Sequence, residues 1–219
     1  MGIPYPSLGR RASRAVRSNR DGLAPTHLAV SVAKVEQALV FASIIVGVAI
    51  SDQIVSLHRL LRSGQPIRWH WAQPWFAVLV LLLNVMIWWS IVGEQKATLT
   101  IGEFLPILVQ LILLALLTIA TFPDSIGSEG VDLAVFYQSN RRYQWSLLAL
   151  TLAWNMLADV GAAIHQDTPF WTAVANESED SFVIAIMVAL IFIRRWWLIA
   201  LGMALLSMGP INWLSRSLG

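Results

Sequence analysis

The chain has 219 residues, of which 57% are hydrophobic and only 13% are charged. Soluble domains usually carry about 25% charged residues, so this chain lacks the polar side chains that a water-facing surface requires. Its net charge is +2, and we expect no nucleic-acid partner. The absence of cysteine excludes disulfides, thiolate metal ligands and cysteine nucleophiles.

Residues 1–30 are rich in Arg, Ser and Pro and show no apolar periodicity. We therefore predict a disordered tail, followed by a single transmembrane helical domain over residues 31–219. Five arginines in the tail suit an anchor on anionic lipid or a targeting segment. The alternative is that translation starts near Val32 or Val35 and the tail is not part of the protein.

The clearest spanning helix lies at residues 35–62 (VEQALVFASIIVGVAISDQIVSLHRLLR). It carries Glu36 near its start, has no further charge until Asp52, and ends in a basic cluster that runs from His58 to Arg62. A long apolar run closed by basic residues is typical of a membrane-spanning helix with a cytoplasmic end.

The apolar residues fall in blocks of about twenty rather than in alternating short strands, which predicts an all-α membrane bundle and not a β-barrel. Six transmembrane helices are predicted, with five as the alternative. The six spans are residues 37–58, 72–92, 100–121, 144–164, 180–193 and 196–214.

The choice between five and six spans depends on the last hydrophobic block, Phe182 to Met208, which contains Arg194 and Arg195 near its middle. As one helix the block would be about 40 Å long, and each arginine at mid-bilayer would cost roughly 2.5–3.5 kcal/mol. A helical hairpin that turns at the arginines places both at the interface. We favour the hairpin, although its first helix is short for a membrane span.

The charges of the predicted loops indicate an orientation. Seven arginines fall on one side of a six-span arrangement and mostly acidic residues fall on the other, so the positive-inside rule predicts both termini outside. The arginine-rich tail opposes this prediction. The basic set is Arg59, Arg62, Arg68, Arg141, Arg142, Arg194 and Arg195, and the opposite set is Lys34, Lys96, Arg216, Glu36, Glu94, Glu103, Asp167, Glu177, Glu179 and Asp180.

The first two spans, with FASIIVGVAISDQIVSLHRLLR, a basic loop that ends in IRWHW, and FAVLVLLLNVMIWW, resemble a group of small bacterial multi-pass membrane proteins of no assigned function. The likeness covers about a quarter of the chain. It implies a multi-pass protein of the bacterial inner membrane, and it implies no function and no site residues.

Ionisable residues within membrane spans are costly, so Asp52 and Asp159 are candidate site residues. Spans one and four align at an offset of 107 residues, with coincidences at Ala42/Ala149, Asp52/Asp159 and His58/His165. This is a weak sign of a 3+3 inverted repeat of the kind common in transporters. The alternative is that each aspartate is an interfacial carboxylate with a hydroxyl or arginine partner.

Three amides, Asn84, Gln110 and Asn155, are predicted near the middle of spans two, three and four. Such amides usually hydrogen-bond between helices, at about 1 kcal/mol each, and the sharper hypothesis is a polar path through the bundle. We count these three amides with Asp52, Asp159 and His58 as the candidate intramembrane polar site.

These patterns predict a small transporter or channel-like protein for a cation or proton, in the lipid bilayer and as a homo-oligomer. The alternative is a structural, accessory or sensory membrane protein that transports nothing. The sequence has no HExxH, GxSxG or P-loop motif, so we expect no enzyme, no cofactor and no metal site.

Overall fold

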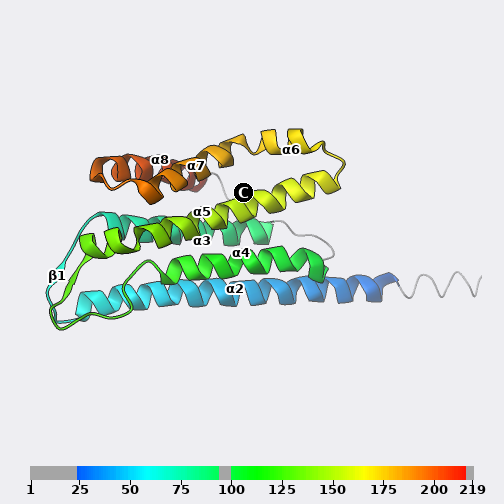
Figure 1. Ribbon diagram of the computed structural model, residues 1–219. Helices are drawn as coiled ribbons and strands as arrows, with labels where there is room; N and C mark the ends of the chain where they lie inside the picture. Colours follow the sequence, from blue (N-terminus) through cyan, green and yellow to red (C-terminus); the bar gives the residue numbers. More distant parts are fainter. Residues whose placement is uncertain (1–23, 94–99, 216–219) are drawn as a thin grey trace, which may run out of the picture.

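The computed structural model describes residues 24–93 and 100–215, and this part of the chain is helical apart from two strands of two residues each. Figure 1 shows the arrangement. In chain order the elements are α2 (Ala24–Arg62), β1 (Ile67–Arg68), α3 (Ala72–Gly93), α4 (Ile101–Ile119), β2 (Val131–Asp132), α5 (Leu133–His165), α6 (Phe170–Asn176), α7 (Ser178–Phe192) and α8 (Trp196–Leu214).

Five helices are long and apolar enough to cross a membrane: α2 from Val35 onwards, α3, α4, α5 and α8. The predicted all-α class is confirmed, and five such helices are compatible with a membrane protein. The fifth predicted span, residues 180–193, corresponds to α7, which has 15 residues. Its length of about 22 Å falls short of a hydrocarbon core of about 30 Å.

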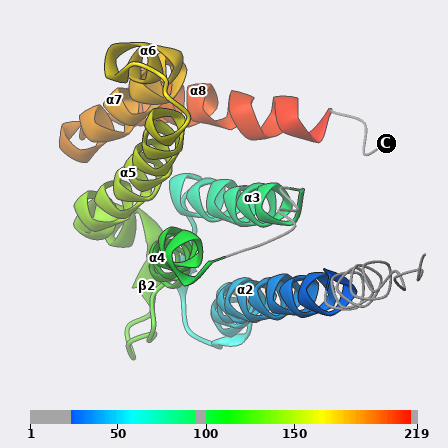
Figure 2. The same ribbon diagram turned by 90° about the vertical axis from the view of Figure 1, so that its right-hand side faces the viewer.

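The helices form layers that the two views show in the same order (Figures 1 and 2). At one side lies α2, followed by α4, then by α3 and α5, and α6 to α8 lie at the opposite side. Many large apolar side chains point outward on these helices, including Ile44, Val48 and Val78. Such a surface suits contact with lipid rather than water.

Three connections meet at one end of the bundle, which we call the basic end. They are residues 63–71 between α2 and α3, 120–132 between α4 and α5, and 193–195 between α7 and α8. The first two pair through the parallel strands β1 and β2, and Arg68 forms an ion pair of 3.5 Å with Asp132. The seven arginines of the basic set lie in these connections or in the adjoining helix turns.

The basic end also holds three acidic residues, all in the connection between α4 and α5: Asp124, Glu129 and Asp132. We call the opposite end the acidic end. Its carboxylates within the described residues are Glu36, Glu103, Asp159, Asp167, Glu177, Glu179 and Asp180. The residues 1–23 of the predicted tail, together with Glu94, Lys96 and Arg216, lie outside the described residues.

The helical break required by the predicted hairpin is present. Helix α7 ends at Phe192, α8 begins at Trp196, and both Ile193 and Arg195 have extended backbone conformations. The buried Arg141 of α5 donates a hydrogen bond of 2.6 Å to the carbonyl oxygen of Ile193. This bond satisfies a carbonyl group that the end of α7 leaves without a helical partner.

Two helices begin earlier than the predicted boundaries. Residues 24–30, expected to be disordered, already belong to α2, because Pro25 in the first turn is compatible with a helix. Helix α5 starts at Leu133 rather than at residue 144, because Asp132 caps it by accepting hydrogen bonds from the backbone N–H groups of Ala134 and Val135. The short helix α6 was not predicted.

The packed core fills the half of the bundle nearest the basic end. Its largest side chain is Trp145, which donates a hydrogen bond of 2.9 Å to the Tyr137 hydroxyl and contacts Phe76 edge to face. Leucines and methionines of α3, α4, α7 and α8 surround these rings. The half of the bundle nearest the acidic end is less filled, and there the helices enclose a cavity.

Helix α8 crosses α3 obliquely. Its first residue, Trp196, stacks on His70 with ring centroids 4.1 Å apart. Ser207, far along α8, nevertheless accepts a hydrogen bond from Trp75 in the first turn of α3. The two residues that α8 contacts here, His70 and Trp75, both lie at or just before the start of α3. Helix α8 therefore crosses α3 rather than running alongside it, as Figure 2 shows.

Candidate functional site

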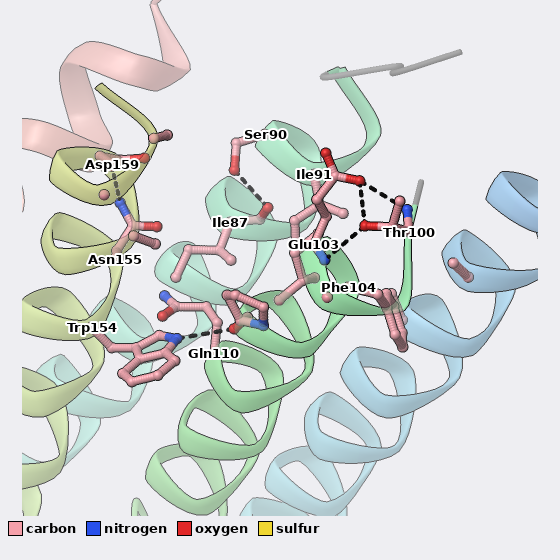
Figure 3. Close-up of a pocket in the computed structure, with 18 of the residues that line it drawn as sticks. Ile87, Ser90, Ile91, Thr100, Glu103, Phe104, Gln110, Trp154, Asn155 and Asp159 are labelled. Atoms are coloured by element: carbon pink, nitrogen blue, oxygen red, sulfur yellow. Dashed lines mark hydrogen bonds between the residues drawn. The ribbon is translucent and has the colours of Figure 1, made fainter. Parts of the chain in front are cut away.

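A cavity of about 610 Å³ lies between α2, α3, α4 and α5, in the half of the bundle nearest the acidic end (Figure 3). Its lining consists of Val35, Ala38, Leu39, Ala42, Ile87, Ser90, Ile91, Thr100, Gly102, Glu103, Phe104, Pro106, Ile107, Gln110, Trp154, Asn155, Ala158, Asp159, Gly161, Ala162 and His165. This volume is within the range of about 300–1,000 Å³ that is usual for small-molecule sites.

The directions of the helices divide the lining into an inner and an outer layer. The inner layer, nearest the middle of the bundle, consists of Ala42, Ile87, Gln110 and Trp154, one residue from each helix. The outer layer contains the charged groups Glu103 and Asp159 together with His165. The cavity is therefore acidic at its outer end and largely apolar within.

Helix α4 is fixed at its start by a capping box. The Glu103 carboxylate accepts hydrogen bonds from both the backbone N–H and the hydroxyl of Thr100, and the backbone N–H of Glu103 donates to the Thr100 hydroxyl oxygen. Glu103 is thus the acidic residue of the first turn of this helix. The cap also holds the carboxylate beside the cavity, where Figure 3 shows it.

Trp154 joins α5 to α4, two of the four helices that surround the cavity. Its indole N–H donates a hydrogen bond of 2.9 Å from α5 to the carbonyl oxygen of Pro106 on α4. The amide of the next residue, Asn155, donates a hydrogen bond of 2.9 Å to the carboxylate of Asp159, which lies one turn further out on α5. Within about one and a half turns, α5 thus presents an indole, an amide and a carboxylate beside the cavity.

Gln110 is the unusual residue of the inner layer. Its side chain extends from α4 towards α5 (Figure 3), and the residue is only 6% exposed. Neither its amide nitrogen nor its amide oxygen has a hydrogen-bond partner among the described residues. A buried polar group without a partner costs about 1–3 kcal/mol, so this amide calls for a bound water or ligand.

A column of polar side chains continues from the cavity towards the basic end. Asn84 of α3 donates a hydrogen bond of 2.8 Å to the Thr118 hydroxyl of α4. Gln73 donates to the carbonyl oxygen of Thr121, and Gln144 donates to that of Ala120 over 2.8 Å. In each of the three amides the carbonyl oxygen is buried and has no partner in the described part of the chain.

A further carboxylate lies beside the outer part of the cavity. Partial burial, followed by repulsion from Asp159 and Asp180, raises the pKa of Glu177 above its ordinary value of 4.5. Negative charge is therefore concentrated at this end of α5. Among the described residues, no three His, Cys, Asp or Glu side chains are grouped so that they could hold a metal ion.

The structure brings three of the six predicted site residues, Gln110, Asn155 and Asp159, to the cavity. Asn84 lies in the polar column. Asp52 and His58 are elsewhere: Asp52 is half-buried on α2, about 15 Å along the helix from the cavity residue Ala42. The two aspartates thus lie in opposite halves of the bundle, and the inverted repeat stays a prediction.

Sequence reasoning missed several residues of the site. Gln73 and Gln144 were not considered because they lie at the edges of predicted spans, whereas polar groups were sought at mid-span. Trp154 was not considered either, although it directly precedes Asn155. The i, i+4 spacing of Asn155 and Asp159 was the available signal, since it places both on one helix face.

Comparison with known proteins identifies no relative. No family model matches the chain, and neither a curated protein nor a solved structure is significantly similar to it. The class that the structure defines is therefore an all-helical protein with five helices able to cross a membrane and a cavity within the bundle.

Proposed function

We propose that this chain is a multi-pass membrane transporter or channel-like protein that admits a cation or proton through the acidic cavity. The observation that carries the proposal is Gln110, a buried amide without a partner in the innermost layer of a cavity with carboxylates at its outer end. Glu103 and Asp159 favour cations there and disfavour anions. Deeper in the cavity, the Gln110 amide offers an oxygen ligand to a cation that has passed the carboxylates.

The polar column supports a route beyond the cavity. Buried amide oxygens are usually satisfied by ordered water when protein partners are lacking, so the oxygens of Asn84, Gln73 and Gln144 favour water along this column. Leu114, which is buried, lies on α4 between Gln110 and Thr118. The route is interrupted there, so passage requires a second conformation in which this leucine moves.

We further propose six membrane crossings, with α7 as the fifth. Helix α7 packs along α5, from the contact of Ser181 with Met156 to the bond of Ile193 with Arg141. It thus extends from near the acidic end to the basic end. The bilayer must thin locally around so short a helix.

The number of crossings can be tested by cysteine labelling, because the natural chain has no cysteine. Exposed positions near the two ends are Arg142, Arg194 and Glu179. We expect Arg142→Cys and Arg194→Cys to react with a membrane-impermeant maleimide from one face, and Glu179→Cys from the other. If Arg194→Cys and Glu179→Cys were labelled from the same face, α7 would not cross the membrane.

Transport itself is tested with the protein in proteoliposomes, by recording proton and alkali-cation flux under an imposed membrane potential. Flux above that of empty vesicles, reduced by Asp159→Asn and Gln110→Leu, is the expected result. Asp52→Asn is the matched control, since its carboxylate lies outside the cavity. Absence of flux in all conditions would refute the proposal. Because so thin a bundle leaves little room for a path, we also propose that the protein is a homo-oligomer. From the resemblance of its first two spans, we propose that it lies in the bacterial inner membrane.

A second candidate function is a sensory or accessory membrane protein that binds a ligand and transports nothing. The observation that favours it is that Gln53 donates to a backbone carbonyl of α3, and that Gln73 and Gln144 donate to backbone carbonyls directly after the end of α4. Such bonds join helices to one another, as structural amides do. Saturable binding without flux would favour this candidate.

A further inference from the structure

We infer that the cavity binds an amphipathic organic cation, with an ammonium group at one end of an apolar body and a hydrogen-bonding group at the other. This inference rests on the proposed function, because it names the substrate class of the same site. Three features of the lining carry it: where the charges lie, what forms the walls, and what lies at the inner end (Figure 3).

The sign of the ligand charge follows from the outer layer. Glu103 and Asp159 are both in the lining, which contains no lysine or arginine among the described residues. Charge-assisted hydrogen bonds between an ammonium group and carboxylates are roughly twice as strong as neutral ones. A phosphate or carboxylate at the same place would meet like charge, so an anionic ligand is excluded.

The walls decide between an organic and an inorganic cation. Between the carboxylates and Gln110, the wall side chains are mostly aliphatic or aromatic, among them Ile87, Ile107 and Trp154. A bare metal ion requires about six oxygen ligands, whereas the inner layer has one side-chain amide oxygen. An apolar body that covers these walls gains burial free energy at about 25 cal/mol per Å².

The inner end of the cavity supplies the second polar contact. Glu103 and Gln110 are two turns apart on α4, which places them about 10 Å apart along the helix axis. The Gln110 amide has one donor group and one acceptor atom, and neither is used. A ligand whose ammonium group lies at the acidic outer end of the cavity reaches this amide with a hydroxyl or amide at the end of a medium-length chain.

The test uses the full chain in phosphatidylcholine nanodiscs and four probes with the same alkyl chain: octylamine, aminooctanol, octanol and octanoate. Equilibrium dialysis against protein-free nanodiscs removes the contribution of partition into lipid. We expect saturable binding of octylamine, tighter binding of aminooctanol, and no saturable binding of octanol or octanoate. Equal binding of all four probes would overturn the inference, as would the absence of saturable binding.

Variants assign the contacts. We expect Asp159→Asn and Glu103→Gln each to weaken octylamine binding about tenfold or more, the loss typical of a charge-assisted hydrogen bond. Glu103→Gln retains the capping box, because Gln serves in that position as Glu does, so α4 stays formed. Gln110→Leu should remove only the advantage of aminooctanol over octylamine. Asp52→Asn should change nothing, and an equal loss in Asp52→Asn would overturn the assignment.

An ammonium group in a membrane has two sources, a free amine or the headgroup of an aminophospholipid. Nanodiscs that contain phosphatidylethanolamine distinguish them: retention of this lipid in native mass spectrometry, and its displacement by octylamine, identify the headgroup as the source. Amine binding without flux leaves this inference intact and refutes transport. Proton or alkali-cation flux without amine binding supports transport and refutes this inference.

Discussion

The guanidinium group of Arg141, in the third turn of α5, donates a hydrogen bond of 2.6 Å to the carbonyl oxygen of Ile193, the residue that caps the end of α7. A second bond, of 3.0 Å, goes from the same nitrogen to the side chain of Gln138. One buried cation thus fixes the place where the last hydrophobic block breaks into two helices. The two arginines of that block itself, Arg194 and Arg195, are exposed at the same end of the bundle.

We predict that Arg141→Met lowers the free energy of unfolding by roughly 2–3 kcal/mol, because it removes charged hydrogen bonds and leaves the Ile193 carbonyl without a partner. Arg142→Met is the matched control, since Arg142 is exposed. The measurement is thermal unfolding in detergent, followed by tryptophan fluorescence. A comparable loss of stability in both variants would show that net charge, and not this bond, is responsible.

Gly130 is predicted to tolerate no side chain. Its φ is +88°, and an added Cβ would lie 1.9 Å from the carbonyl oxygen of Pro66, where β1 and β2 meet. Gly130→Ala should therefore cost well over the roughly 1–2 kcal/mol of left-handed strain alone. Gly64→Ala is the control, because Gly64 has a φ of +64° and open space around its Cβ position. Equal melting temperatures for the two variants would contradict the close approach.

The pair formed by Asn84 and Thr118 should show an energetic coupling of about 0.6–1 kcal/mol in a double-mutant cycle, the usual size for such bonds in membrane bundles. Thr118→Val alone leaves the Asn84 amide with one partner fewer, whereas the double variant with Asn84→Leu removes both partners and should be nearly neutral. Thr151→Val serves as the control, since within the described part of the chain the Thr151 hydroxyl bonds to Leu147 of its own helix and to no other helix. The coupling between Asn84→Leu and Thr151→Val should be zero.

Stability near the acidic end should depend on pH through Glu177. Because the pKa of Glu177 is raised, the folded protein binds this proton more tightly than the unfolded chain does. Stability therefore falls as pH rises from the ordinary value of 4.5 through the higher folded value. We expect Glu177→Gln to flatten this part of the melting profile, and Asp180→Asn, which removes one repelling carboxylate, to flatten it partly. An unchanged profile in Glu177→Gln would contradict the assignment.

The fold could be predicted from the sequence where one residue type dominates the energetics. Paired arginines in an apolar block have a high cost at mid-bilayer, so the break before Trp196 and the bounds of α8 were predictable. Helix α5 was predicted too short, because its first turns carry polar residues that tertiary contacts, and not hydropathy, keep helical. The oblique crossing of α8 depends on the packing of Trp196 against His70 and on the hydrogen bond from Trp75 to Ser207, and hydropathy encodes neither contact.

The candidate site was predictable in part, for a related reason. Hydropathy marks polar residues within apolar runs, and this signal found Gln110, Asn155 and Asp159. It carries no information on which helix faces which. The structure places Glu103 in the lining of the cavity and Asp52 outside it, because the part of α2 that lines the cavity ends at Ala42.

The two short strands have a mechanical meaning. By pairing, β1 and β2 join the α2–α3 connection to the α4–α5 connection, so these two helical hairpins are fastened together at the basic end, where the core is also most densely packed. The cavity lies in the opposite half. Any motion that widens it is then a splaying of helix ends about a fixed pivot, and the greatest displacement falls on Glu103 and Asp159. The groups that would meet a cation first are those with the most room to move.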